Sequence, residues 1–328
     1  MNIYDVTLRD GNHALRHQLK VEFVEKYCAL ADISGVWAVE VGHGNGLGAS
    51  SYLVGKSVAT DQQLLVAARS KLKNAKLAVH SIPGFATLNR DLIPAVDLGV
   101  DIFRVATHVT EANTAEKHID YLANKDITVH GVLMMSHMIS IDGLISQAKL
   151  MQSYGATAVI IMDSSGHFIP TEVRERIDAL KNELNIEVGF HAHNNLGVAV
   201  SNAVIAQKSG ASIIDGASMG LGAGAGNAQL EGIIAVKNRD DRQRDLAPFY
   251  KMSQAIESDF AENLPRMTSS SIQSGMAGVF SGYAPQVKAL AQELGIEPET
   301  LWSEIAKRRL VAGQESMIRE IAQDLMNL

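Results

Sequence analysis

The segment IEVGFHAHNN at residues 186–195 has the character of an apolar strand that ends in two histidines and two asparagines. On a β-strand, residues i and i+2 lie on the same face, so His191 and His193 converge on one point at the end of the strand. Two imidazoles on one face are typical of a divalent-metal site, but two ligands are too few to hold the ion. A third ligand has to come from elsewhere in the fold.

Seven further segments have the same strand-like character, and helical patterns separate them. The eight expected strands are residues 2–6, 36–41, 75–80, 101–107, 127–134, 156–163, 186–193 and 211–217. Amphipathic stretches such as DQQLLVAARSKL and PTEVRERIDALKNEL lie between them. Eight strand–helix units predict an α/β fold, a (β/α)8 TIM barrel. A doubly wound parallel sheet is the alternative.

The strand-like pattern stops near residue 240, and amphipathic helical patterns follow it to the C-terminus. We therefore expect a TIM-barrel catalytic domain at residues 1–239 and a helical C-terminal domain at residues 240–328. The second domain would either cover one end of the barrel or dock a partner protein.

The composition limits the class of protein. The chain has 328 residues, is 46% hydrophobic and carries a net charge of −7, which gives no reason to expect nucleic acid or an anionic membrane as a partner. The N-terminal segment lacks the pattern of a signal peptide, and no apolar run reaches the roughly 18 residues of a membrane span. The single cysteine, Cys28, excludes an internal disulfide and lies in a helix-like run, where we expect it to be buried. These features predict a cytoplasmic protein.

The end of the first expected strand offers the missing metal ligand. In a TIM barrel the C-terminal ends of all strands open onto one face. The segment DVTLRDGNH at residues 5–13 follows the first strand, so Asp10 can face His191 and His193 across the mouth of the barrel. Taken alone, Asp10 would more often be a turn residue, but two imidazoles and one carboxylate hold a divalent cation and leave positions open for substrate.

Two glycine-rich loops belong to the same end of the barrel. EVGHGNGLGASS at residues 40–51 follows the second strand, and its glycines allow close backbone approach. MGLGAGAGNAQLEG at residues 219–232 follows the eighth strand, and its backbone N–H groups could hold an anion. It is not a dinucleotide fingerprint, because Asn227 stands where the third glycine should be. Arg104 and His108, at the end of the fourth strand, are ambiguous.

Seven motifs resemble the metal-dependent 4-hydroxy-2-oxovalerate aldolases. They are DVTLRDGNHALRHQ, EVGHGNGLGASS, RVATHVTEAN, VLMMSHM, GFHAHNNLGVAVSNA, MGLGAGAGNAQLE and VAGQESMI. The resemblance covers nearly the whole chain, and the superfamily also holds hydroxymethylglutaryl-CoA lyase and isopropylmalate synthase. It implies a class II pyruvate aldolase, a carbon–carbon lyase that cleaves a 4-hydroxy-2-oxoacid reversibly to pyruvate and an aldehyde in aromatic catabolism.

The resemblance also implies roles for individual residues. The metal ligands would be Asp10, His191 and His193, with Mn²⁺ as the expected ion and Mg²⁺ or Co²⁺ as alternatives. Arg9 would hold the enolate, His13 would remove the proton of the C4 hydroxyl, and Ser164 would seat the pyruvate carboxylate. The C-terminal region would contact an acylating aldehyde dehydrogenase that receives the aldehyde, and we expect an oligomer.

Three departures from the family pattern bear on the aldehyde. HSIPG places His80 where the family has a leucine, GMAGVF places Met276 and Phe280 where it has tyrosines, and GNG places Asn45 where it has an aspartate. Because a buried imidazole needs a hydrogen-bond partner, His80 favours a polar aldehyde. We expect His80 and Phe280 to contact the substrate and the class of reaction to be retained.

Two functions of other classes remain open. One is a transferase that condenses an acyl-CoA with a 2-oxoacid, and the other is a non-catalytic barrel that binds a partner. A Schiff-base aldolase is disfavoured, because no lysine lies in the strand-end motifs.

Overall fold

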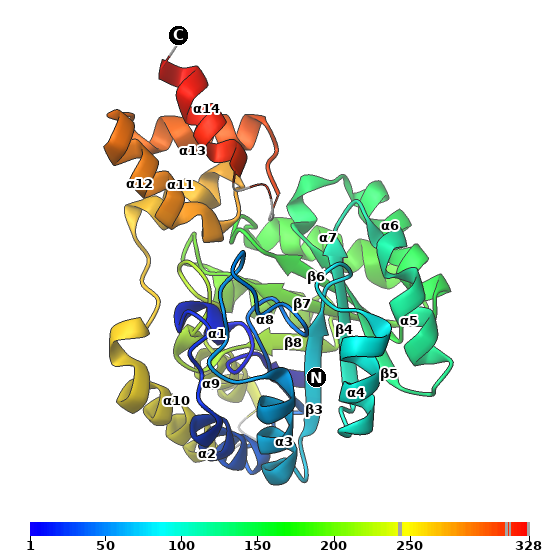
Figure 1. Cartoon of the computed structure of the whole chain (residues 1–328). Helices are drawn as coiled ribbons and strands as arrows, with labels where there is room; N and C mark the ends of the chain where they lie inside the picture. Colours follow the sequence, from blue (N-terminus) through cyan, green and yellow to red (C-terminus); the bar gives the residue numbers. More distant parts are fainter. Residues whose placement is uncertain (242–244, 312–313, 315, 327–328) are drawn as a thin grey trace.

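The computed structural model describes residues 1–241, 245–311, 314 and 316–326. Within them, eight parallel strands close into a barrel in sequence order, and β8 pairs with β1 (Figure 1). The strands are β1 (Asn2–Asp5), β2 (Ala38–Glu40), β3 (Lys76–Ser81), β4 (Ile102–His108), β5 (Thr128–Met134), β6 (Ala158–Asp163), β7 (Glu187–Ala192) and β8 (Ile213–Gly216). The predicted TIM barrel is confirmed, and each strand begins and ends within two residues of its expected range.

Helices follow the strands and cover the outside of the barrel. They are α1 (Gly11–Ala14), α2 (Val21–Asp32), α3 (Asp61–Lys71), α4 (Ile93–Asp97), α5 (Glu116–Ala123), α6 (Ile141–Ser153), α7 (Pro170–Glu183), α8 (Ala199–Lys208) and α9 (Leu230–Asp241). Local sequence fixes several of their starts. At α3, the Thr60 hydroxyl accepts from the Gln63 backbone N–H at 3.2 Å, and the Gln63 side chain accepts from the Thr60 N–H at 2.9 Å. This capping box satisfies two N–H groups that a helix start leaves unpaired.

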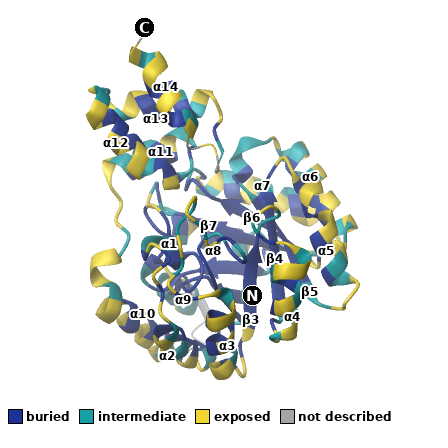
Figure 2. Ribbon diagram, in the orientation of Figure 1, coloured by how far each residue is buried: buried dark blue, intermediate teal, exposed yellow. Residues whose placement is uncertain are grey.

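The alternation of side chains along the strands produces two cores. In β7, Val188 and Phe190 point outward into the apolar layer between strands and helices. Gly189 and His191 point into the barrel, where a side chain on Gly189 would overlap Ile160. Figure 2 shows the strands as mostly buried, and Cys28 lies fully buried in the outer core, as expected.

Four further helices form a separate helical unit beyond the barrel. They are α11 (Ser269–Ala277), α12 (Ala284–Leu294), α13 (Pro298–Lys307) and α14 (Ser316–Met326), and their apolar core is centred on Trp302, Tyr283 and Leu301. The expected helical C-terminal region is therefore confirmed. None of the helices in the described part of the chain is both long and apolar enough to cross a membrane.

The helical unit lies over the C-terminal ends of β5 to β7, and side chains of the barrel make several of the contacts. Asn195 Nδ2 donates to Ser271 O at 3.1 Å, to Ser274 Oγ at 2.8 Å and to Ser281 Oγ at 2.8 Å. His137 Nε2 lies 2.9 Å from Gly278 O, and His167 Nδ1 lies 2.7 Å from Gly275 O. In Figure 1, α11 lies on the side of the helical unit that faces the barrel.

Helix α10 (Ala247–Phe260) precedes this unit and packs on the side of the barrel. Its residues Phe249, Met252 and Ile256 belong to the outer core of the barrel, and the Phe260 ring meets the Phe23 ring of α2 edge to face at 4.6 Å. Packing thus groups α10 with the barrel, whereas the sequence pattern groups it with the C-terminal helices. The domain boundary at residue 239 stays a prediction.

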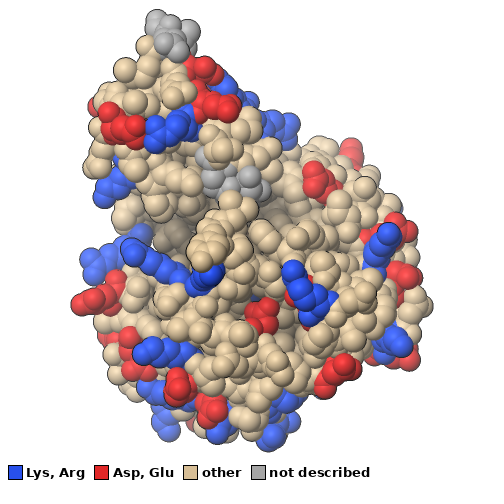
Figure 3. Space-filling view, in the orientation of Figure 1, with Lys and Arg blue, Asp and Glu red and all other residues tan. Residues whose placement is uncertain are grey.

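The surface carries charges of both signs. Figure 3 shows acidic and basic side chains interspersed over the face that it presents, both on the barrel and on the C-terminal helices. This distribution matches the small net charge of −7.

Candidate metal centre

Three side chains meet at the mouth of the barrel: His191 in β7, His193 just after it, and Asp10 in the segment after β1. His191 Nε2 lies 3.3 Å from His193 Nε2, and Asp10 Oδ2 lies 3.9 Å from the first nitrogen and 4.0 Å from the second. All three residues are buried, and their ligand atoms lie within 4.8 Å of one another. The structure therefore brings together the three residues that the sequence predicts as metal ligands.

The donor atoms of this cluster fit a divalent cation. Two nitrogen ligands, each about 2.1 Å from one ion, lie about 3.0 to 3.4 Å apart, and the two histidine nitrogens meet this spacing. Burial lowers the pKa of His193 to about 4, so its imidazole is neutral and has a lone pair to offer at pH 7. Burial opposes ionisation of Asp10, but the Arg9 guanidinium and the histidines outweigh it and hold the pKa of that carboxyl well below its ordinary value.

The second oxygen of Asp10 is held by the glycine-rich loop after β8. Asn227 Nδ2 donates to Asp10 Oδ1 at 3.0 Å, and the backbone N–H of Ala223 donates to the same oxygen at 3.2 Å. The anion that this loop holds is thus the Asp10 carboxylate itself. With Oδ1 fixed in this way, Oδ2 faces the two histidines.

Arg9 lies beside the cluster and has one unused donor. Its Nη1 donates to Asp10 Oδ2 at 2.6 Å and to Gly44 O at 3.3 Å, and its Nε donates to Glu40. Its Nη2 is buried and has no partner among the described residues. A buried guanidinium nitrogen without an acceptor is costly, so this atom is suited to an anionic group of a ligand.

Three buried contacts through Arg104 and Asp215 connect Glu40 with His191. Arg104 Nη1 donates to Glu40 Oε2 at 3.1 Å and to Asp215 Oδ2 at 2.8 Å, and Asp215 Oδ2 lies 2.8 Å from His191 Nδ1. Burial opposes ionisation of Glu40, but Arg9 and Arg104 outweigh it and lower its pKa to about 2. The carboxylate is therefore charged at pH 7.

Two family models match the chain, one over the barrel and one over the C-terminal helices. Residues 1–256 match a family described as HMGL-like, and residues 265–327 match a DmpG-like communication domain. The chain belongs to the HMGL-like family.

Named relatives of this HMGL-like chain are similar over nearly their whole length. A protein of Spirochaeta aurantia is 50% identical over 325 residues, which cover 98% of this chain and 95% of the relative. A protein of Pectobacterium atrosepticum is 48% identical over 323 residues, with coverage of 98% and 94%. Both are named 4-hydroxy-2-oxovalerate aldolase.

A solved structure shares the fold at low sequence identity. The carboxyl transferase domain of Rhizobium etli pyruvate carboxylase has a TM-score of 0.82 and 15% identity, covering 99% of this chain and 60% of that one. This likeness concerns the fold alone.

His13 lies on α1 of the HMGL-like barrel, next to Arg9. Its ring packs against the backbone of Gly44, where an added Cβ would lie 2.7 Å from ring atoms, and Gly44 O is also an acceptor for Arg9. The His17 ring meets the His13 ring at 5.3 Å and stacks on the His43 ring at 3.7 Å. Burial lowers the pKa of His13 to about 4, so its imidazole is neutral at pH 7.

His80 and Ser164 lie at the ends of two further strands. His80 is buried in β3, its Nδ1 lies 3.9 Å from Glu40 Oε1, and that nitrogen has no hydrogen-bond partner among the described residues. The imidazole thus points into the barrel. Ser164 follows β6 and is buried, and its Oγ accepts from the Met135 N–H at 3.0 Å, which leaves its hydrogen available for donation.

Phe280, Met276 and Asn45 make no described contact with the cluster. Phe280 precedes a 3-10 turn (Ser281–Tyr283) and packs edge to face on Tyr283 at 5.8 Å, within the core of the C-terminal helices. Met276 is 68% exposed on α11, and Asn45 is partly buried in the loop after β2. The described contacts do not bring these three to Asp10, His191 or His193.

Sequence reasoning missed Glu40, Asp215 and Asn227. Glu40 follows Ala38 on the inner face of β2, and Asp215 follows Ile213 on the inner face of β8. A lone acidic residue at an inward position of an apolar strand is the feature that could have revealed both. Asn227 lies in a loop, and nothing in its neighbouring sequence indicates a contact with Asp10.

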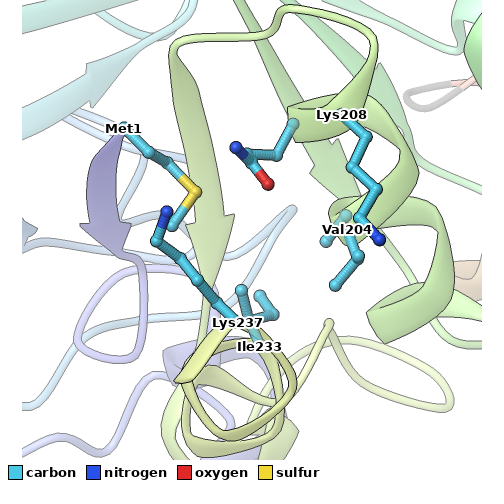
Figure 4. A pocket seen from close by; sticks show the side chains of 7 residues that line it. Met1, Val204, Lys208, Ile233 and Lys237 are labelled. Carbon is cyan, nitrogen blue, oxygen red and sulfur yellow. The ribbon is translucent and has the colours of Figure 1, made fainter. Parts of the chain in front are cut away.

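A pocket at the other end of the barrel is separate from this centre. It lies beside Met1, at the start of β1, and Lys208 and Lys237 of α8 and α9 line it (Figure 4). Since the candidate metal ligands lie at the C-terminal ends of the strands, this pocket takes no part in their site.

Proposed function

We propose that this chain is a divalent-metal-dependent pyruvate aldolase. It would cleave a 4-hydroxy-2-oxoacid such as 4-hydroxy-2-oxovalerate to pyruvate and an aldehyde, in a reversible reaction of the carbon–carbon lyase class. The observation that carries the proposal is Arg9, whose unpartnered Nη2 lies beside the Asp10–His191–His193 cluster. Relatives named 4-hydroxy-2-oxovalerate aldolase, at 46–50% identity, support it.

Cleavage starts with loss of the C4 hydroxyl proton, and His13 is the base that we assign to it. The neutral imidazole takes the proton, the C4 oxygen becomes the aldehyde carbonyl, and the C3–C4 bond breaks. The electron pair of that bond moves into the enolate of pyruvate, which a proton then converts to pyruvate. In the direction of addition, the same histidine returns the proton to the new hydroxyl.

Arg9 stabilises the negative charge that develops on the enolate oxygen. Its other donors already hold Asp10, Gly44 and Glu40, so the guanidinium is fixed before the substrate arrives. Nη2 can therefore donate to the enolate oxygen without reorganisation of the side chain. The Ser164 hydroxyl is assigned to the pyruvate carboxylate.

Asp10, His191 and His193 are the residues that would hold the cation. A bound divalent ion supplies Lewis-acid stabilisation of the enolate charge. One carboxylate and two imidazoles suit first-row ions that accept mixed oxygen and nitrogen ligands, and we propose Mn²⁺, with Mg²⁺ or Co²⁺ as substitutes.

His80 and Phe280 are assigned to recognition of the aldehyde. The inward imidazole of His80 has a buried, unpartnered Nδ1, and a hydroxylated or otherwise polar aldehyde could supply the missing partner. Compared with the family's tyrosine, Phe280 lacks a hydroxyl and therefore one hydrogen bond, worth about 0.5–1.5 kcal/mol. Cleavage would continue without that hydrogen bond.

The C-terminal helices are assigned to an acylating aldehyde dehydrogenase. The match of residues 265–327 to a DmpG-like communication domain supports this, and so do Ile272 and Met276, which are 41% and 68% exposed one turn apart on α11. An oligomeric, cytoplasmic enzyme of aromatic catabolism completes the proposal.

The proposal is tested with the Mn²⁺ form of the whole chain and a panel of 4-hydroxy-2-oxoacids. We expect pyruvate release that requires the metal, and we expect Asp10→Ala to lose both the metal and the turnover, because only two protein ligands remain. Full metal occupancy in Asp10→Ala would overturn the ligand assignment. Release of free thiol from acetyl-CoA in the presence of a 2-oxoacid, without any cleavage, would instead indicate a transferase.

A further inference from the structure

The two candidate histidine ligands differ in what holds the nitrogen that faces away from the cluster. His191 Nδ1 lies 2.8 Å from Asp215 Oδ2, whereas His193 Nδ1 is buried without a partner among the described residues. A histidine whose Nδ1–H is donated to a carboxylate keeps its Nε2 lone pair for a metal. Asp215 therefore acts on one ligand only.

Arg104 joins this carboxylate to the opposite side of the site. Its Nη1 donates to Asp215 and to Glu40, and Glu40 in turn accepts from Nε of Arg9. Arg9 donates to Asp10, so a continuous chain of charged contacts runs from one side of the metal cluster to the other. Asp10, Arg9, Glu40, Arg104 and Asp215 are all at most 4% exposed, which leaves water little access to these contacts.

We propose that Asp215 and Arg104 are positioning residues for the metal ligand His191. Asp215 accepts from Nδ1–H and so fixes the tautomer and the ring plane of His191, with Nε2 directed at the cation. Arg104 holds Asp215 and Glu40 with one nitrogen, and so fixes the distance between His191 and the Arg9 guanidinium. The inference rests on the proposed metal site and adds two residues to it.

The surroundings of Arg104 require an arginine. Its guanidinium lies over the Tyr4 ring, 4.4 Å from the centroid, and the residue is fully buried. A flat cation can stack on the ring while its Nη1 reaches both carboxylates, whereas a lysine ammonium is compact and cannot stack in this way. The charges also suit a cation: three carboxylates and two guanidiniums leave one negative charge for the ion to balance.

The test measures Mn²⁺ binding by calorimetry on the whole chain, without substrate, for wild type, Asp215→Asn and Arg104→Lys. We expect Mn²⁺ affinity to fall by about 10- to 100-fold in Asp215→Asn, the usual effect of removing a carboxylate behind a histidine ligand. Arg104→Lys should weaken binding in the same direction. The visible absorption spectrum of the Co²⁺ form should shift in both variants, because it reports the geometry around the ion.

Asp5→Asn is the matched control. Asp5 is also a fully buried carboxylate, but it faces outward from β1 and binds Thr7 and the Tyr27 hydroxyl instead of a histidine. The Asp5→Asn variant should have the Mn²⁺ affinity and the Co²⁺ spectrum of wild type, even if its free energy of unfolding differs. This separates loss of a buried charge from loss of His191 alignment.

The results distinguish three cases. Weaker Mn²⁺ binding and a shifted Co²⁺ spectrum in Asp215→Asn support the inference, and this variant decides the matter where Arg104→Lys does not fold. Wild-type affinity and an unchanged spectrum in Asp215→Asn overturn it, while metal-dependent cleavage by wild type leaves the proposed function standing. A wild-type chain that binds no Mn²⁺ overturns both.

Discussion

Replacement of Arg9 by lysine separates charge from shape at the site. Arg9 directs three nitrogens to different places: Nε to Glu40, Nη1 to Asp10 and Gly44, and Nη2 to the space beside the cluster. Lysine keeps one positive charge but has one nitrogen. That nitrogen will stay with Asp10 and Glu40, since both are buried carboxylates, and the enolate then has no donor on this side.

The expected size follows from that single lost donor. Removing one preorganised donor at a developing oxyanion costs about 10²- to 10³-fold in kcat, or about 2.7–4 kcal/mol. The folded state should survive, because the charge that balances Asp10 and Glu40 is retained, and the loss of one buried hydrogen bond costs about 1–3 kcal/mol. Mn²⁺ should remain bound, because all three ligands are intact.

The assay couples pyruvate release from 4-hydroxy-2-oxovalerate to NADH oxidation by lactate dehydrogenase, at saturating substrate and Mn²⁺, with metal content measured in parallel. Arg16→Lys is the control, since Arg16 is an exposed arginine just after α1. A kcat close to wild type in Arg9→Lys, with full metal, would remove Arg9 from enolate stabilisation. Loss of metal from that variant would mean that Arg9 acts through Asp10 instead.

Four other perturbations test separate parts of the structure. His191→Ala should abolish both metal retention and turnover, and metal analysis of the purified variant would contradict the assignment if occupancy were full. Burial raises the pKa of Asp5 to about 6, so the folded state favours its neutral form and wild type loses stability as pH rises from about 4 to about 6. In urea unfolding, the free energy of unfolding of Asp5→Asn relative to wild type should therefore rise by about 3 kcal/mol between about pH 4 and pH 6. A difference that does not change with pH would refute this. His80→Leu should shift the ratio of kcat/KM between matched alkyl and hydroxylated aldehydes about tenfold towards the alkyl ones in aldol addition, and equal ratios would show that His80 does not choose the substrate. Asn195→Ala should speed amide hydrogen exchange in residues 269–281, because three acceptors there lose their donor, and unchanged exchange would show that other contacts hold the C-terminal helices.

The clustering of Asp10, His191 and His193 was predictable because it follows from strand periodicity and barrel topology. His191 and His193 share a face in any strand, and Asp10 lies at the same end of the barrel as they do. Glu40 and Asp215 were not identified, although each is a single acidic residue at an inward position of an apolar strand. Their role depends on Arg104, which crosses the barrel from β4, and no local pattern specifies that reach.

The C-terminal helices show the same limit at a larger scale. Their amphipathic patterns predict helices with one apolar face, and the structure confirms those helices. Where that unit sits depends on contacts such as those of Asn195, which join residues 76 to 86 positions apart in sequence. Helical periodicity carries no information about such pairs, and it also assigned α10 to the C-terminal helices although its apolar residues pack on the barrel.

The way the helical unit is seated affects how the two parts of the chain can diverge during evolution. The barrel contributes the side chains of His137, His167 and Asn195, and three of their acceptors are main-chain carbonyls, at Ser271, Gly275 and Gly278. The hydroxyls of Ser274 and Ser281 are the side-chain acceptors. A carbonyl oxygen is present whatever side chain a residue carries. Apart from Ser274 and the glycines that allow close approach, the outward positions of α11 can therefore change without loosening these contacts. Substitutions that adapt this surface to a new partner would leave the barrel, and the chemistry within it, undisturbed.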